Sequence, residues 1–220
     1  MLTIVPTPIW NLEDITLRAI RTLKEVDYIV CEDTRTTWVL LKHYDITTPT
    51  LSYHSHSGQA KTNKILDILK NGKQVALVSD AGTPGISDPW YALIQEVLKA
   101  WYEVSALPWA SAVITALSAS GKPSHHFLYL WFLPIKKWRH THLKRISENY
   151  NETVVIYESV HRIIKTLSDL KTYFWEEHQI VIGRELTKKF EEYIRGNISE
   201  VETYFLKNPW KIKGEFVILI

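Results

Sequence analysis

The chain has 220 residues, 45% of them hydrophobic, and its 26 Lys and Arg nearly balance its 24 Asp and Glu. This composition is typical of a globular protein with a real core and excludes disordered and fibrous classes. No apolar run reaches the roughly 18 residues of a membrane span, and the single cysteine, Cys31, excludes a disulfide framework or a cysteine metal cluster. We therefore expect a cytoplasmic protein without membrane contact.

Tryptophan and glycine occur in unusual amounts. The chain has 9 Trp and only 8 Gly, and this glycine content is about half of the ~7% found in average proteins. Together the two types make up 17 of 220 residues, about 7.7%, which is an ordinary glycine content.

The first half of the chain alternates short apolar runs with helical patterns. Strands are predicted at residues 2–5, 28–31, 75–79 and 104–107, and helices at 12–24, 36–44, 62–70 and 91–99. We expect Asn11 and Asp14 to begin the first helix, by capping free N–H groups and by facing the positive helix end. The alternation favours a doubly wound parallel sheet.

The second half contains another set of elements after a polar stretch at residues 120–124. Strands are predicted at 127–131, 154–157, 179–182 and 215–219, and helices at 139–149, 160–173 and 199–206. We therefore predict two α/β domains, 1–120 and 121–220, each with a mainly parallel or mixed sheet flanked by helices.

The strongest local motif follows the third predicted strand and reads Val78-Ser-Asp-Ala-Gly-Thr-Pro-Gly-Ile-Ser-Asp-Pro89. Open α/β sheets bind ligands at the carboxyl ends of their strands, and Gly82 and Gly85 allow tight turns there. Asp80 has the chemistry to accept from a ribose hydroxyl or to hold a cationic ligand. The alternative is a Gly-Pro turn capped by Asp88. No Gly-Lys-Ser/Thr follows, so this is not a Walker loop.

Three more polar clusters stand at predicted strand ends. They are Glu32-Asp-Thr-Arg35, Tyr157-Glu-Ser-Val-His-Arg162 and Arg184-Glu-Leu-Thr-Lys-Lys189. Each alone is compatible with solvated ion pairs. Together they indicate a site that orients a hydroxyl, a phosphate or another anion.

A basic segment runs from Lys136 to Arg145 and is either a phosphate-contacting patch or a solvated helix face. Two closely spaced histidine pairs, 54/56 and 140/142, lack a third ligand, so we expect no metal site. No Gly-x-Ser-x-Gly elbow is present, which disfavours a serine hydrolase.

The motifs resemble the ribosomal RNA small subunit methyltransferase I family, a branch of the tetrapyrrole methylase superfamily, over nearly the whole chain. The matching stretches are residues 6–19, 31–35, 51–54, 78–89, 107–111, 132–134, 157–162, 184–189 and 213–216. The resemblance implies a homodimer of two-domain α/β subunits that bind S-adenosylmethionine between the domains. It also implies methylation of the 2′-hydroxyl of a cytidine in small-subunit ribosomal RNA, free or within the ribosomal subunit.

The same resemblance guides the choice of site residues. On the cofactor side we place Pro8, Asp80, Gly82, Ile86, Ser111, Ala112, Phe132 and Gly214. On the catalytic, substrate side we place Asp33, Arg35, Glu158, His161, Arg162, Glu185 and Lys188. Alternatives are a superfamily methylase acting on a corrinoid or a protein side chain, and a non-catalytic RNA-binding module.

Tryptophan stands at positions where the family has glycine. These are Trp10, Trp90, Trp109 and Trp131, and glycine is also common at Trp38, Trp101 and Trp138. Trp101 and Trp175 follow predicted helices, where a left-handed cap favours glycine, and Trp210 suits a turn. One hypothesis is that UGA codons read as glycine by the organism have been translated as tryptophan. The alternative is genuine tryptophan in the core or stacking on RNA bases.

Overall fold

The computed structural model describes residues 1–54, 57–86, 88, 90–108 and 111–220. The chain forms two compact units, Met1–Ser111 and Ala112–Ile220, which are described separately. Both are α/β units with one sheet each, so the predicted fold class is confirmed.

The first unit contains a fully parallel five-stranded sheet of order β3-β2-β4-β1-β5. Its strands are β1 (Leu2–Ile4), β2 (Tyr28–Cys31), β3 (Thr50–Ser52), β4 (Val75–Leu77) and β5 (Val104–Ala106). Its helices are α1 (Leu17–Glu25), α2 (Thr34–His43), α3 (Gln59–Lys70) and α4 (Tyr91–Lys99), with a 3-10 turn at Leu12–Asp14. Because all strands are parallel, the loops that leave their carboxyl ends share one edge.

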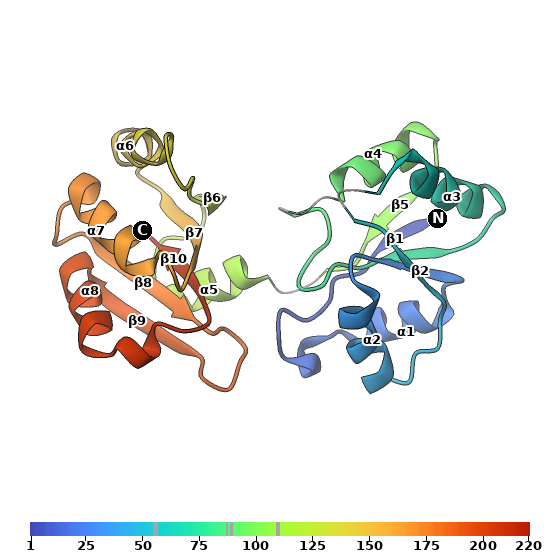
Figure 1. Cartoon of the computed structure of the whole chain (residues 1–220), viewed down its shortest axis with the longest axis horizontal. Helices are drawn as coiled ribbons and strands as arrows, with labels where there is room; N and C mark the ends of the chain where they lie inside the picture. The colour runs from blue at the N-terminus through green and yellow to red at the C-terminus, as the bar shows by residue number, and fades with distance from the viewer. Residues whose placement is uncertain (55–56, 87, 89, 109–110) are drawn as a thin grey trace. The chain divides into compact units, whose positions relative to one another are not determined.

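Helices cover both faces of this parallel sheet, as the doubly wound prediction requires. Leu23 of α1 and Leu40 of α2 pack in one buried cluster, whereas Leu69 of α3 and Leu93 of α4 pack in another. Figure 1 shows α1 and α2 on one side of the sheet and α3 and α4 on the other. The sheet interior is apolar on both faces, which is typical of a parallel sheet.

The second unit contains a mixed five-stranded sheet of order β6-β7-β10-β8-β9, in which only β6 and β7 are parallel. Its strands are β6 (Phe127–Phe132), β7 (Thr153–Ser159), β8 (Gln179–Arg184), β9 (Glu192–Asn197) and β10 (Glu215–Leu219). Its helices are α5 (Ala112–Ser120), α6 (Arg139–Asn149), α7 (Ile163–Phe174) and α8 (Ile198–Lys207), with a 3-10 turn at Pro209–Lys211. Figure 1 shows α5 on one face of this sheet and α7 and α8 on the other.

The boundary between the units precedes α5, whereas the sequence suggested a break after residue 120. Val113 and Leu117 of α5 are buried against Val155 of β7 and Val217 of β10. Burial of these apolar side chains makes α5 part of the second unit. The roles predicted for the two domains stay predictions.

Several elements differ from the sequence-based expectation, and α5 was not among the predicted helices. Strands β3 and β9 were not expected, because β3 has three residues and β9, at the sheet edge, has only two hydrophobic residues, Tyr193 and Ile194. The first helix begins at Leu17 rather than at residue 12. Asn11 caps the preceding 3-10 turn by accepting from the N–H of Glu13, and Thr16 caps α1 by accepting from the N–H of Ala19.

Neither a membrane span nor a metal cluster occurs in the described part of the chain. None of the helices found there is long and apolar enough to cross a bilayer. Among the same residues, no three His, Cys, Asp or Glu side chains are grouped to hold a metal ion. His56, one of the paired histidines, lies outside the described residues.

Candidate functional site

The loop after β4 is tied to the loop after β1. The N–H of Thr7 donates to the carbonyl of Gly82 at 2.9 Å, and the N–H of Gly82 donates back to Thr7 at 3.1 Å. The Thr7 hydroxyl also donates to the carbonyl of Ser79 at 2.9 Å. Gly82 has a φ of 80°, a conformation that residues with a Cβ rarely adopt. The two loops therefore form one rim at the carboxyl edge of the parallel sheet.

The rim combines buried and exposed residues of the predicted cofactor side. Pro8 and Gly82 are buried and shape the rim, whereas Asp80 and Ile86 are exposed. Oδ1 of Asp80 accepts from the backbone N–H of Asp33 at 3.2 Å. Among the described residues, Oδ2 of Asp80 has no hydrogen-bond partner. The first unit thus presents a carboxylate oxygen and an apolar side chain on one loop.

Asp33 begins α2 and is engaged by Arg35. Its Oδ1 accepts from the backbone N–H of Arg35 at 2.8 Å, and the guanidinium of Arg35 reaches Oδ2 at 2.7 Å. These hydrogen bonds lower the pKa of Asp33 to about 2, and the one from the Arg35 side chain has the larger effect. Asp33 is therefore ionised at neutral pH, and its low pKa makes it a weak base.

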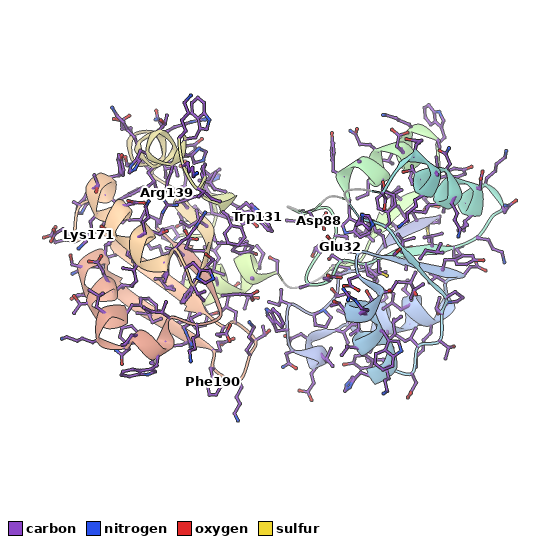
Figure 2. All side chains as sticks on the ribbon, in the orientation of Figure 1. Glu32, Asp88, Trp131, Arg139, Lys171 and Phe190 are labelled. Carbon is purple, nitrogen blue, oxygen red and sulfur yellow. The ribbon has the colours of Figure 1, made fainter. Side chains whose placement is uncertain are left out.

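The other carboxylates of this edge have the opposite tendency. Partial desolvation of the carboxyl groups raises the pKa of Glu32, Asp80 and Asp88, and the neighbouring carboxylates raise that of Glu32 further. Asp88 accepts from the N–H groups of Gly85 and Trp90 at 2.8 and 3.1 Å. This is the turn-capping role that the sequence left as the alternative, and it applies to Asp88. Figure 2 shows where Glu32 and Asp88 lie in the first unit.

In the second unit, Glu158 lies at the centre of a buried ion network. Its side chain is fully buried and accepts from Arg162 at 2.7 Å and from the hydroxyl of Thr166 at 2.5 Å. Arg139, also buried, approaches Glu158 at 3.9 Å and pairs with Asp169 at 2.6 Å. Such a carboxylate has little access to a substrate, so the geometry favours a positioning role for Glu158.

The same network holds the loop that follows β6. Arg162 donates to the carbonyl of Leu133 at 2.9 Å, and Arg139 donates to that of Pro134 at 3.5 Å. Phe132, predicted to contact the cofactor, directly precedes these residues, and its ring centroid lies 5.9 Å from that of Tyr157. Burial raises the pKa of Tyr157. The structure thus brings Phe132, Glu158 and Arg162 together, while His161 is exposed.

Glu185 and Lys188 form a second cluster at the same edge of the mixed sheet. Nζ of Lys188 lies 2.7 Å from Glu185 and 3.2 Å from Glu215. The backbones of Glu185 and Thr187 have positive φ values of 52° and 63°. Non-glycine residues in this conformation are uncommon and cluster at functional sites. Glu215 pairs with Ser159 across β10 and β7, which places both clusters at one sheet edge.

Gly214 faces Glu185 rather than open space. A Cβ built at position 214 would lie 1.9 Å from Oε1 of Glu185, and the φ of Gly214 is 84°. Glycine is therefore required for close approach to this carboxylate. Gly214 was predicted on the cofactor side, and its contact in this structure belongs to the Glu185 cluster.

Two predicted cofactor residues flank the unit boundary. Ser111 ends the first unit, and Ala112 begins α5 of the second. Trp109, which stands where the family has glycine, lies outside the described residues. The roles of these residues stay predictions.

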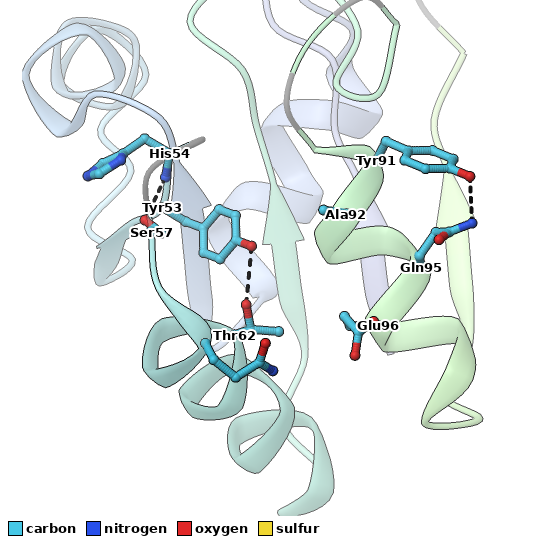
Figure 3. Close-up of a pocket in the computed structure, with 9 residues that line it drawn as sticks. Tyr53, His54, Ser57, Thr62, Tyr91, Ala92, Gln95 and Glu96 are labelled. Atoms are coloured by element: carbon cyan, nitrogen blue, oxygen red, sulfur yellow. Dashed lines mark hydrogen bonds between the residues drawn. The ribbon is translucent and has the colours of Figure 1, made fainter.

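A surface pocket of about 330 Å³ lies between α3 and α4 and was not predicted from sequence. Figure 3 shows the Tyr53 hydroxyl paired with Thr62 at 3.2 Å and Gln95 donating to Tyr91 at 2.6 Å. His54, from one of the family-like stretches, also lines it. The sequence signal for this region was the family-like stretch of residues 51–54, and the strand before Tyr53 was missed.

Comparison with known sequences gives consistent matches over the whole chain. A family model described as Tetrapyrrole (Corrin/Porphyrin) Methylases matches residues 1–202. Proteins named "Ribosomal RNA small subunit methyltransferase I" from Streptococcus pyogenes serotype M1 and Haemophilus influenzae are 45% and 44% identical to the chain. Each alignment covers 100% of this chain, with 75% and 78% of the respective relatives.

Solved structures support the fold. A diphthine synthase matches with a TM-score of 0.73 at 12% identity, over 100% of this chain and 88% of that one. A cobalt precorrin-4 methyltransferase matches with a TM-score of 0.71 at 15% identity, over 99% of this chain and 93% of that one. The uroporphyrin-III C-methyl transferase of Thermus thermophilus, complexed with S-adenyl homocysteine, matches with a TM-score of 0.63 at 16% identity. The match covers 99% of this chain and 96% of that one.

Proposed function

The chain belongs to the tetrapyrrole methylase family, and on that premise we propose that it methylates the ribose 2′-hydroxyl of a cytidine in small-subunit ribosomal RNA. Methyl transfer from S-adenosylmethionine is the chemistry of this family, and the predicted resemblance to its ribosomal RNA branch is confirmed. The observation that carries the proposal is this identity of about 45% over the full chain. The choice of a cytidine 2′-hydroxyl rests on the sequence resemblance.

The rim of the first unit fits S-adenosylmethionine, which supplies an electrophilic methyl group when bound. Oδ2 of Asp80 is exposed and without a partner among the described residues, so it can accept from a ribose hydroxyl or face the sulfonium. Ile86 on the same loop offers an exposed apolar side chain for the adenine. Pro8 and Gly82 fix the loop that carries Asp80. We propose that Ser111, Ala112, Phe132 and Gly214 complete the cofactor side.

The acceptor needs a group that favours its alkoxide. We assign this role to Lys188, whose ammonium is held by Glu185 and Glu215 in a loop with left-handed backbone. A positioned cation stabilises negative charge that develops on a ribose oxygen. Glu185 then acts by orienting Lys188.

The other predicted catalytic residues receive different roles. Asp33 has a pKa of about 2, and Glu158 is buried and saturated with donors, so neither is suited to remove a proton at neutral pH. Asp33 holds the loop of Asp80 through its N–H, and Arg35 is exposed beside it. Glu158 and Arg162 position the loop after β6. His161 is exposed and available to an RNA phosphate.

The second unit carries a surface suited to RNA, which we name the α6 basic surface. It consists of the exposed residues Lys136, Lys137, His140, Lys144 and Arg145. The sequence contains no Asp or Glu between Glu103 and Glu148, and Glu148 lies 3.7 Å from Lys144. Because the chain as a whole is nearly neutral, this local charge is the feature that can attract phosphates.

The test is methyl transfer from labelled S-adenosylmethionine to small ribosomal subunits and to free small-subunit RNA, followed by mapping of the modified ribose. Lys188→Met is expected to keep cofactor binding and to lose turnover by about a hundredfold or more. Labelling of another nucleotide would refute the cytidine assignment. Absence of cofactor binding, both in this chain and in a Trp131→Gly variant, would refute the enzyme and favour a non-catalytic RNA-binding module. Sedimentation of the purified protein tests the proposed homodimer.

A further inference from the structure

Three helices of the first unit end in the same hydrogen-bonded motif. The residue after the helix cap has a positive φ in each case: Asp45 after α2 (50°), Gly72 after α3 (74°) and Trp101 after α4 (61°). Glycine is the usual residue at this position, and Asn or Asp can also adopt the conformation. Tryptophan has a Cβ, unlike glycine, and lacks the short polar side chain with which Asn and Asp adopt this conformation.

The hydrogen bonds show that the motif is the same at Gly72 and Trp101. The N–H of Gly72 donates to Leu69 at 3.0 Å, and that of Lys73 donates to Ile68 at 3.3 Å. At the end of α4, the N–H of Trp101 donates to the carbonyl of Leu98 at 3.0 Å. The next residue, Tyr102, donates to that of Val97 at 3.2 Å. Both ends are Schellman motifs, so position 101 has the backbone of a glycine site.

Two further tryptophans have glycine-like backbones. Trp175 ends α7 with φ 52° and ψ 160°, beside a region that is populated almost only by glycine. Trp131 has φ 57° and lies in a bulge of β6, where the register shifts between Tyr129 and Phe132. Left-handed bulge positions also favour glycine. Of the six non-glycine residues with positive φ in the described part of the chain, three are therefore tryptophan.

The environments of the tryptophans support the same conclusion. Tryptophan is highly buried on average, yet of the eight that the structure describes only Trp90 is buried, and Trp101 is 95% exposed. The indole N–H of Trp90 has no acceptor among the residues that the structure describes. A buried donor without an acceptor is destabilising.

Base stacking does not explain this distribution. Trp101 follows α4 and precedes β5, so it lies at the amino edge of the parallel sheet, opposite the loops that carry Asp80 and Asp33. Trp175 likewise ends a helix before β8 begins. Stacking platforms need aromatic side chains along a nucleic-acid path, whereas these occupy separate helix ends.

We infer that the natural protein carries glycine at positions 101, 131 and 175. We further infer that all nine tryptophan positions are encoded by UGA codons, which the organism reads as glycine. The ordinary glycine content of the 17 combined residues agrees with this inference. It does not depend on the activity of the protein.

The consequence for the proposed function concerns position 131 and rests on that function. The indole of Trp131 packs against Tyr157 and Phe132, with ring centroids 5.5 and 5.1 Å apart. Figure 2 shows Trp131 in the second unit. With glycine there, a ligand can approach the backbone next to Phe132 more closely. Residue 131 is then part of the cofactor surface, which the indole covers.

The gene and the native protein give the direct test. We expect UGA at all nine tryptophan positions. Peptides of the protein isolated from its own organism should have the mass of glycine at positions 101, 131 and 175. UGG codons at these positions, or peptides with the mass of tryptophan there, overturn the inference.

Paired substitutions test the backbone argument. Trp101→Gly and Trp101→Ala both remove the indole, but only glycine removes the Cβ that strains a left-handed residue. We expect the glycine variant to melt roughly 2–8 °C above the alanine variant, with the same order for Trp175. Trp138, with a φ of −97°, is the matched control, and glycine should give no advantage over alanine there. Equal melting temperatures of the pairs at 101 and 175 contradict a glycine site.

Cofactor binding separates this inference from the proposed function. Trp131→Gly is expected to bind S-adenosylmethionine roughly tenfold more tightly than Trp131→Ala, measured by calorimetry. UGA codons together with no binding by Trp131→Gly would uphold the glycine assignment and refute the methylase. Tight binding by the tryptophan-bearing chain, together with UGG codons, would refute the glycine assignment and uphold the methylase.

Discussion

The backbone N–H of Asp33 donates to Oδ1 of Asp80 over 3.2 Å, which joins the loop after β2 to the loop after β4. Asp33 is in turn fixed by Arg35 at the start of α2. One oxygen of Asp80 is thereby committed to the protein. The other oxygen has no hydrogen-bond partner among the residues that the structure describes and can accept from a ligand.

Replacement of Asp80 by Asn is expected to weaken S-adenosylmethionine binding by about 10- to 100-fold, because hydrogen bonds to a charged group contribute about 1.5–3 kcal/mol. Calorimetric titration measures the change. Asp27→Asn is the control, since Asp27 also accepts a backbone N–H, from Gln74 at 2.7 Å, but lies before β2 at the opposite edge. Equal losses in both variants would show that Asp80 acts only on folding.

The titration of Asp33 provides the second prediction. Its carboxyl should titrate with a pKa near 2, and Arg35→Gln should move the midpoint most of the way toward the ordinary value of 3.8, since the Arg35 side chain is the largest cause. The pKa is lower in the folded state, so the contribution to stability is present above about pH 4 and is lost as the pH falls toward 2. Carboxyl NMR measures both midpoints. An unchanged midpoint in Arg35→Gln would assign the shift to backbone donors alone.

The sequence predicted the elements whose side chains repeat clearly and missed those defined by their neighbours. Apolar runs located β2 and β10, and a helical pattern located α6 at its observed bounds. Strand β3 has three residues and exists because Ile29 and Cys31 of β2 pair with Thr50 and Ser52. Such pairing is a tertiary property that no local pattern carries.

The site shows the same division. Gly82 and Asp80 were predicted because a glycine loop after a strand has a direct chemical meaning. The burial of Glu158 was not, because the sequence places it at a strand end but cannot show that Thr166 and Arg162 surround it. The residues of the pocket around Tyr53 come from two helices and one loop, so they have no common spacing.

The buried network around Glu158 predicts a large loss of stability. Glu158→Gln should lower the free energy of unfolding by about 3 kcal/mol or more, because it leaves Arg162 and Arg139 near an uncharged partner. Urea denaturation measures the change. Glu148→Gln is the control, since the exposed pair of Glu148 with Lys144 contributes less than about 1 kcal/mol. Similar midpoints for the two variants would mean that Glu158 is not structural.

The α6 basic surface predicts a salt-dependent contribution to RNA binding. Glutamine at Lys136, Lys137, Lys144 and Arg145 should weaken binding to small-subunit RNA, and the slope of log K against log salt should fall by roughly 1 for each phosphate that the protein no longer neutralises. Filter binding over a salt series measures both. The charge-matched control replaces four exposed residues of the first unit with glutamine: Arg21, Lys24, Lys64 and Lys70. An equal effect of the control would indicate attraction by net charge alone.

The contact between Gly214 and Glu185 predicts a functional effect that a similar glycine lacks. Gly214→Ala and Gly72→Ala introduce a Cβ at φ values of 84° and 74°, and both should lose about 1–2 kcal/mol of stability from this conformation. At Gly72 nothing lies within 4 Å of the new Cβ, whereas at Gly214 Oε1 of Glu185 would be 1.9 Å away. Glu185 must therefore move in Gly214→Ala, and Lys188 loses its 2.7 Å contact with Glu185. We expect methyl transfer to fall in Gly214→Ala well beyond any change in Gly72→Ala, when both are assayed below their melting temperatures. If the two variants keep equal turnover, Glu185 does not position Lys188 for the reaction.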